Sequence, residues 1–177
     1  MPLQSDQSLT KEQNIYLLSI NGLALQYIIE PTMEMRKTAL KQTYKALIFI
    51  EEPTEDEILD TLRTEPVAIQ YLSNPDVKMQ LEAISKYTCA VEFIRGELSD
   101  ETKILALIKN ADYARFVDKV DGGILAMVFG FNKRFKNVML CSLNQSGSFK
   151  GMEEFIIVQQ IIYWKLIERY PLLVDYL

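Results

Sequence analysis

Histidine is absent from the 177-residue sequence, and cysteine occurs only twice, at Cys89 and Cys141. Without histidine the chain has no Ser-His or Cys-His nucleophile pair and no histidine-ligated metal site. Two thiols also cannot complete a four-thiolate cluster. Seven glycines and six prolines leave little room for a phosphate-binding loop. Carboxylates are plentiful, but none lies on an otherwise apolar face, where catalytic carboxylates are usually found. We therefore expect no catalytic site, no cofactor and no metal.

Long apolar runs and an excess of basic residues are missing as well. The longest apolar stretch, residues 155–167, is interrupted by Gln159, Gln160 and Lys165, so it is too short and too polar to span a bilayer. The first thirteen residues show no signal-peptide pattern. The net charge is −5, with −8 in residues 1–101 and +3 in residues 102–177. An acidic chain of this kind is repelled by nucleic acid and by anionic lipid, so we do not expect it to bind either without specific contacts. Because neither a signal peptide nor a membrane span is visible, we expect a cytoplasmic protein.

An internal repeat of 22 residues organises the chain. Four alanines recur at this spacing, and an aromatic residue follows each of them three positions later. The alanines are Ala24, Ala46, Ala68 and Ala90, and the aromatics are Tyr27, Phe49, Tyr71 and Phe93. Nine residues before the aromatic position, a leucine or isoleucine occurs at Leu18, Leu40, Leu62, Ile84, Leu107 and Ile167. This common phase predicts that alanines and aromatics face a shared core.

Each repeat is predicted to contain two short helices. The first covers about nine residues, for example Met33 to Lys41, and the second about seven, for example Tyr44 to Ile50. Three prolines spaced by 22 residues precede capping residues that open the first helix, and Ser99 takes this role in the fourth unit. These capping residues are Thr32, Thr54 and Asp76, and Thr54 with Glu57 forms a predicted capping box.

Helices this short cannot bury an apolar face alone, so the pattern predicts an all-α solenoid of five or six stacked helix pairs. We expect an N-terminal segment at 1–13, tandem repeats at 14–120, and a degenerate repeat with a capping helix at 121–177. Within the last region, Ile124 to Phe131 reads equally as a buried helix or a strand, and Met152 to Arg169 as a long closing helix. One stripe of that helix is a candidate self-association surface, formed by Ile157, Ile161, Trp164 and Ile167.

The units resemble short tandem helical repeats of unknown function in bacterial and viral proteins, whose pattern reads xxGxALxYAS. Gly22 to Tyr27 carries the match most fully, and the resemblance covers residues 14–120 and the last few residues. The units are also loosely similar to leucine-rich variant repeats, which alternate an α-helix with a tighter helix. Both resemblances imply a helical-repeat architecture and leave the function open.

The densest charge feature is the turn at residues 51–60, which holds six acids and no base. The simplest interpretation is a solvated turn with acids at a helix N-terminus, where the helix dipole favours them. The alternative is an acidic edge that docks a basic groove on a partner. A calcium site is disfavoured because the glycine and alternation of an EF-hand loop are missing. The candidate edge comprises Glu51, Glu52, Glu55, Asp56, Glu57 and Asp60.

These features together favour a non-catalytic protein-binding module whose partner has a basic surface. A narrower hypothesis is a virus-encoded inhibitor of a host nucleic-acid enzyme or defence complex, in which the viral origin comes from the resemblance alone. The alternative is a structural or homo-oligomeric subunit, such as a homodimer. A nucleic-acid-binding solenoid is disfavoured because it needs a basic concave face, and residues 1–101 are strongly acidic.

Overall fold

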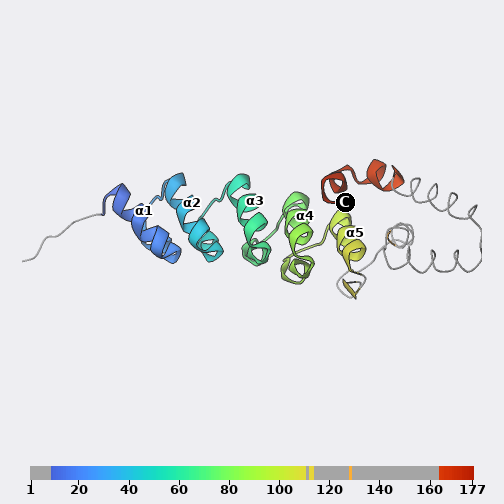
Figure 1. Cartoon of the computed structure of the whole chain (residues 1–177), viewed down its shortest axis with the longest axis horizontal. Coiled ribbons are helices and arrows are strands. Elements are labelled where there is room, and N and C mark those ends of the chain that lie inside the picture. The colour runs from blue at the N-terminus through green and yellow to red at the C-terminus, as the bar shows by residue number, and fades with distance from the viewer. Residues whose placement is uncertain (1–8, 111, 114–127, 129–163) are drawn as a thin grey trace, which may run out of the picture.

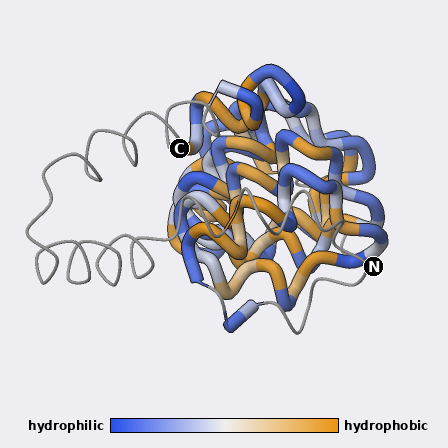
Figure 2. Tube along the Cα trace, turned by 90° about the vertical axis from the view of Figure 1, so that its right-hand side faces the viewer, coloured by the Kyte–Doolittle hydropathy of each residue, from blue (hydrophilic) through white to orange (hydrophobic). Residues whose placement is uncertain are grey.

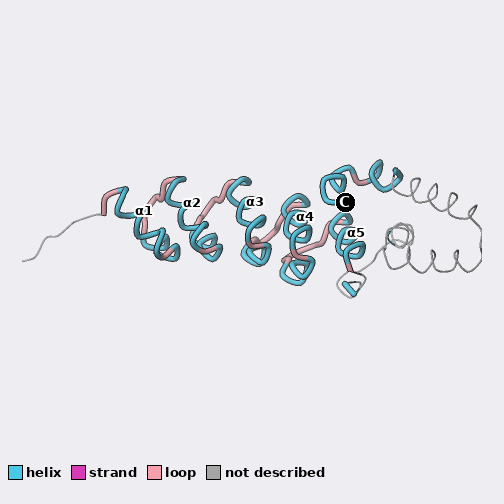
Figure 3. Tube along the Cα trace, viewed as in Figure 1, coloured by secondary structure: helices cyan, strands magenta, loops and turns pink. Residues whose placement is uncertain are grey.

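A computed structural model describes residues 9–110, 112–113, 128 and 164–177. In this part of the chain all regular secondary structure is helical, as Figures 1 and 3 show. The five α-helices each contain ten residues: α1 (Lys11–Ile20), α2 (Met33–Gln42), α3 (Glu55–Thr64), α4 (Val77–Lys86) and α5 (Asp100–Lys109). The described 3₁₀ helices each contain six: η1 (Gly22–Tyr27), η2 (Tyr44–Phe49), η3 (Pro66–Tyr71), η4 (Thr88–Phe93) and η6 (Pro171–Tyr176).

The helix starts follow from side-chain caps. The predicted caps Thr32, Thr54, Asp76 and Ser99 each accept a hydrogen bond from the backbone N–H three residues on, which confirms them. The predicted capping box of Thr54 and Glu57 is present, and Thr10 forms another with Gln13. The first helix therefore begins at Lys11, inside the segment 1–13 that the pattern left outside the repeats.

The helix pairs follow one another in a row (Figure 1). Each α-helix contacts the next α-helix, and η1 to η4 contact one another in the same order. Viewed along the row, hydrophilic residues lie mainly at the periphery (Figure 2). The four repeat alanines are at most 7% exposed, so the prediction that they belong to the core is confirmed. Their small side chains permit the close approach of neighbouring 3₁₀ helices.

The aromatic residues, in contrast, face the core only in part. Phe49 and Tyr71 are half-buried and pack against the core. Tyr27 is 80% exposed and Phe93 38%, so the predicted inward-facing stripe is wrong at these two positions. The prediction assumed that the helical phase of the first helix continues without a break into the second. An extended residue, such as Asn21 with φ −139° and ψ 96°, separates the two helices and resets that phase. The buried position is instead the one after each alanine, occupied by Leu25, Leu47, Ile69 and Val91.

The fourth residue of α2 and of α4 has a polar side chain that forms hydrogen bonds to two successive turns. Arg36 on α2 donates from Nε to the Pro31 carbonyl at 3.2 Å and from Nη1 to the Glu52 carbonyl at 3.4 Å. Gln80, the equivalent residue of α4, donates from Nε2 to the Pro75 and Glu97 carbonyls at 2.9 and 3.2 Å. Its Oε1 also accepts from the backbone N–H of Ser99 at 3.0 Å, and the Gln80 side chain is buried. Each of these side chains therefore bridges two turns.

The C-terminal residues pack against α4 and α5 (Figure 1). Residues 164–169 are helical and η6 follows them, with Leu166 and Leu173 fully buried in the core that contains Leu105. The Tyr176 hydroxyl lies 3.4 Å from Glu82 Oε2, and burial first and then this carboxylate raise the pKa of Tyr176. Most of the predicted closing helix lies outside the described residues, as do Cys141 and the ambiguous run Ile124 to Phe131 apart from Val128, which is helical and buried.

Candidate partner-binding surface

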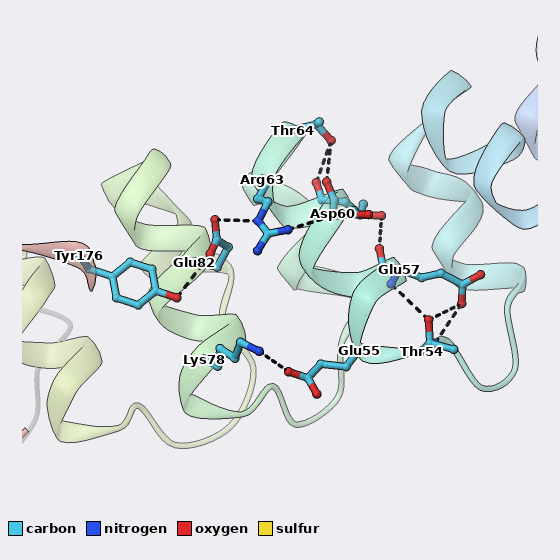
Figure 4. Close-up of polar contacts among 10 residues, drawn as sticks. Thr54, Glu55, Glu57, Asp60, Arg63, Thr64, Lys78, Glu82 and Tyr176 are labelled. Atoms are coloured by element: carbon cyan, nitrogen blue, oxygen red, sulfur yellow. Dashed lines mark hydrogen bonds and ion pairs between the residues drawn. The ribbon is translucent and has the colours of Figure 1, made fainter. Parts of the chain in front are cut away.

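The acidic turn divides into paired and unpaired carboxylates. Glu57 is only 3% exposed, and its Oε2 accepts from the Thr54 backbone N–H at 2.9 Å. Glu55 forms an ion pair with Lys78 at 2.6 Å, which raises the pKa of Lys78. Asp60 lies 2.9 Å from the Arg63 guanidinium (Figure 4). These three members of the predicted edge therefore have local structural roles.

The other three members, Glu51, Glu52 and Asp56, are exposed. Within the described residues none of them is within ion-pair distance of a lysine or arginine. Asp56 nevertheless lies in the first turn of α3, where the helix dipole favours an acid, and its charge contributes to the raised pKa of Lys78. Of the six predicted edge residues, Glu51 and Glu52 therefore remain the candidates for contact with a partner.

Lysines form ion pairs with some of the acids that recur at the starts of the α-helices. Lys11 on α1 contacts Glu34 on α2 at 2.7 Å, and Lys78 on α4 contacts Glu55 on α3 at 2.6 Å. Both bridges join the first turns of neighbouring helices. Lysines of the neighbouring helices thus pair with Glu34 and Glu55, whereas Glu51 and Glu52, in the turn between η2 and α3, have no ion-pair partner among the described residues.

Large apolar side chains are exposed on the same side of the repeat as this turn. Ile29 is 92% exposed and Ile48 57%, and Tyr27 and Phe93 extend from the ends of their 3₁₀ helices. Sequence reasoning missed this surface because it assigned the aromatics to the core. The sequence signal that it overlooked is the isoleucine at position 48, where the neighbouring units carry glutamines at 26 and 70.

Two grooves run between the 3₁₀ helices. The first groove, of about 640 Å³, lies between the ends of η1 and η2 and is lined by Ile28, Ile48, Phe49, Glu30 and Glu51, among others. The second groove, of about 650 Å³, lies between the ends of η2 and η3 and is lined by Ile48, Ile50, Tyr71, Glu51 and Arg95, among others. Glu51 thus lies at the wall between the two, whereas Glu52 lines neither.

Cys89, which its position on a packed helix would place in the core, is half-buried and contacts a tyrosine. Its Sγ is hydrogen-bonded to the hydroxyl of Tyr113, and this bond is the main reason that the pKa of Tyr113 rises to about 12. The thiol is therefore held in place by a ring from the next unit.

The candidate self-association stripe is described only at its C-terminal end. Trp164 is 69% exposed and Ile167 is half-buried, while Ile157 and Ile161 lie outside the described residues. The neighbouring Leu166 faces the core. The C-terminal helix therefore uses one side to pack on the repeat and presents Trp164 on another.

Neither a candidate metal site nor a membrane-spanning helix is present in the described residues. There, no group of three or more histidines, cysteines or carboxylates is arranged to hold a metal ion. No helix in that part of the chain has the length and apolar character needed to cross a membrane. No protein-family model, curated protein or solved structure is significantly similar to the chain. The site must therefore be interpreted from its own geometry.

Proposed function

We propose that the chain is a helical-repeat solenoid that binds a protein partner and has no catalytic role. The repeated α–3₁₀ pairs, the buried alanines and the contacts between consecutive pairs support the solenoid. The observation that carries the binding role is the combination of exposed apolar side chains with unpaired carboxylates. Ile48 and the adjacent Glu51 illustrate it, since neither is needed by the fold. Exposed apolar groups beside charged ones are typical of protein interfaces.

Charge reversal of the turn tests this function. A partner is first captured from the native host, and its affinity is then compared between the parent chain and the double variant Glu51→Lys with Glu52→Lys. Both substitutions spare the Thr54 capping box, so folding survives. Binding should weaken tenfold or more, which is about 1.4 kcal/mol, and should depend strongly on salt.

A matched control carries the same change of net charge elsewhere. The double variant Glu65→Lys with Asp175→Lys reverses two exposed acids that line neither groove. It should bind the captured partner as the parent does. If the variant at positions 51 and 52 also binds like the parent at low salt, the acidic turn is not the binding edge.

Within this class we retain the narrower hypothesis of an inhibitor of a host nucleic-acid enzyme or defence complex. An acidic turn suits a groove that is built to hold phosphates. The hypothesis requires that the captured partner be such an enzyme or complex and that stoichiometric chain lower its activity.

A structural or homo-oligomeric subunit is the second candidate, and the 69% exposure of Trp164 favours it. Burial of such a ring in a dimer interface would contribute substantially to association. Light scattering over a range of concentrations tests this alternative. A dimer that dissociates on Trp164→Ser supports it, and a monomer throughout removes it.

A further inference from the structure

The two grooves are copies of one site. Most positions that line the first groove also line the second, 22 residues further along. Ile28 is followed by Ile50, Phe49 by Tyr71, and Ile50 by Leu72. Ile48 and Glu51 belong to both grooves and form the wall that separates them. Equivalent sites repeated in a row are suited to a linear polymer that presents equivalent groups at a regular spacing.

The chemistry of the grooves favours a polypeptide as that polymer. Their lining is mainly aliphatic and aromatic, which suits apolar side chains. Glu30 and Glu51 line the grooves together with Arg36 and Arg95, so the charged lining residues of the two grooves balance. Of these four, Glu51 lines both grooves, and it forms no ion pair with a described lysine or arginine. The occupant should therefore carry a cationic group beside Glu51, between two apolar groups.

The usual spacing of packed helices suggests a register for such a peptide. Packed helices lie about 8–10 Å apart, and we take this as the distance between equivalent points of the two grooves. A polyproline II segment repeats every three residues and rises about 9.3 Å over them. Side chains at positions i and i+3 of this conformation point to the same side and would match two successive grooves. The two intervening residues then pass over the wall that holds Glu51.

From the two equivalent grooves we infer a binding site for an extended peptide segment of a partner protein, with apolar side chains at i and i+3 and a lysine or arginine between them. The inference rests on the proposed protein-binding function and specifies its ligand. The first apolar side chain enters one groove and the second enters the other, while the cation contacts Glu51.

The probe is a fluorescein-labelled peptide, Ala-Pro-Leu-Arg-Pro-Leu-Pro-Ala, titrated with the full chain and followed by fluorescence polarisation. Its two leucines are three residues apart with arginine between them. We expect saturable binding that weakens tenfold or more when the arginine is replaced by glutamate or when the leucines are moved to a spacing of two. Absence of saturable binding, or equal binding of the peptide with altered spacing, overturns the inference.

Matched variants of the chain locate the site. Ile48→Glu and Ile20→Glu introduce the same charge at side chains of similar exposure, 57% and 60%, but only Ile48 lines the grooves. The first should weaken binding tenfold or more and the second should leave it unchanged. Likewise, Glu51→Lys should weaken binding far more than Glu52→Lys, although both change the net charge equally. Equal effects within either pair contradict a groove site.

The result separates the inference from the proposed function. If the captured partner binds the parent chain and is lost on reversal of Glu51 and Glu52, while the peptide series fails, the acidic turn binds the partner in another way than through an extended peptide, and the inference alone is wrong. If neither the partner nor the peptides respond to these changes, the proposed acidic edge fails as well. A requirement for a helical peptide would also refute the extended register.

Discussion

The two layers of the repeat differ in what they expose to solvent. The α-helices from α3 to α5 expose polar side chains, such as Asp60, Arg63 and Lys109, and several of these form hydrogen bonds or ion pairs. The 3₁₀ side exposes Tyr27, Ile48 and other large apolar groups. The first two α-helices, however, also expose large apolar side chains, such as Tyr16 and Ile20. The contrast between the layers therefore holds from α3 onward, and the feature that distinguishes the 3₁₀ side is the pair of grooves that Ile48 lines.

The largest expected effect contrasts two positions of one 3₁₀ helix. Ala46→Arg places an unpaired charge at a fully buried position and should lower the free energy of unfolding by more than about 3 kcal/mol. Ala68→Arg should behave in the same way. Ile48→Arg, two residues away on η2 and 57% exposed, should change stability by less than about 0.5 kcal/mol. Urea denaturation measures all three, and an unchanged midpoint for either alanine variant contradicts the repeat register.

A smaller loss is expected when the bridge between turns is removed from the α-helical side. Gln80→Leu removes three hydrogen bonds, one buried and two half-buried, and should cost about 2–3 kcal/mol. Arg36→Leu removes the equivalent but more exposed bridge and should cost about 1 kcal/mol. Thermal denaturation would show the order of the two losses. A larger effect at Arg36 would mean that burial does not set the strength of these bridges.

On the 3₁₀ side, one ring contact joins two units. Tyr44 and Tyr71 have ring centroids 6.0 Å apart with planes inclined by 29°. A double-mutant cycle with Tyr44→Leu and Tyr71→Leu should give a coupling energy of about 0.5–1.5 kcal/mol. Because Tyr71 also lines the second groove, the cycle would show how much of its side chain serves stability. A coupling energy near zero would assign the ring to binding alone.

The smallest effect is expected for an ion pair of the α-helical side. The hydrogen bond and charge of Glu55 raise the pKa of Lys78, but both side chains are about half exposed. Lys78→Gln should therefore shift the melting temperature only slightly, and the shift should disappear in high salt. A large shift that persists in high salt would show that the polar layer contributes more to stability than we propose.

The sequence carried enough information to predict the helix pairs but not which residues they expose. Thr54 and Asp76 could be recognised as caps because capping depends on local spacing, and Ala68 as core because its 22-residue period is strict. The exposure of Tyr27 could not be predicted because an extended residue breaks the helical phase. The grooves depend on how separate units pack, and no local pattern encodes that arrangement.

The candidate site was predicted in part for a similar reason. Counting acids identified the turn at Glu51 and Glu52, but Glu55 and Asp60 found partners that the count could not show. The partner of Glu55 lies 23 residues away, one full unit further along the chain. Ile48 was overlooked because the equivalent positions of the neighbouring units carry glutamine, and a comparison of repeats identifies the positions at which the units agree.

The bridging position at Arg36 and Gln80 has a consequence for how the chain can change length. Each of these side chains holds the turn before its own helix and the turn of the following unit. The same kind of junction thus occurs at two points of the row, while the unit between them carries the apolar Ile58 at this position. Duplication of residues 43–64 would leave both bridges intact and add a unit with an apolar residue at the bridging position, whereas inserting part of a unit would separate a bridge from its carbonyl. Gain or loss of whole units would thus let such a chain bind a longer or shorter ligand while keeping the same fold.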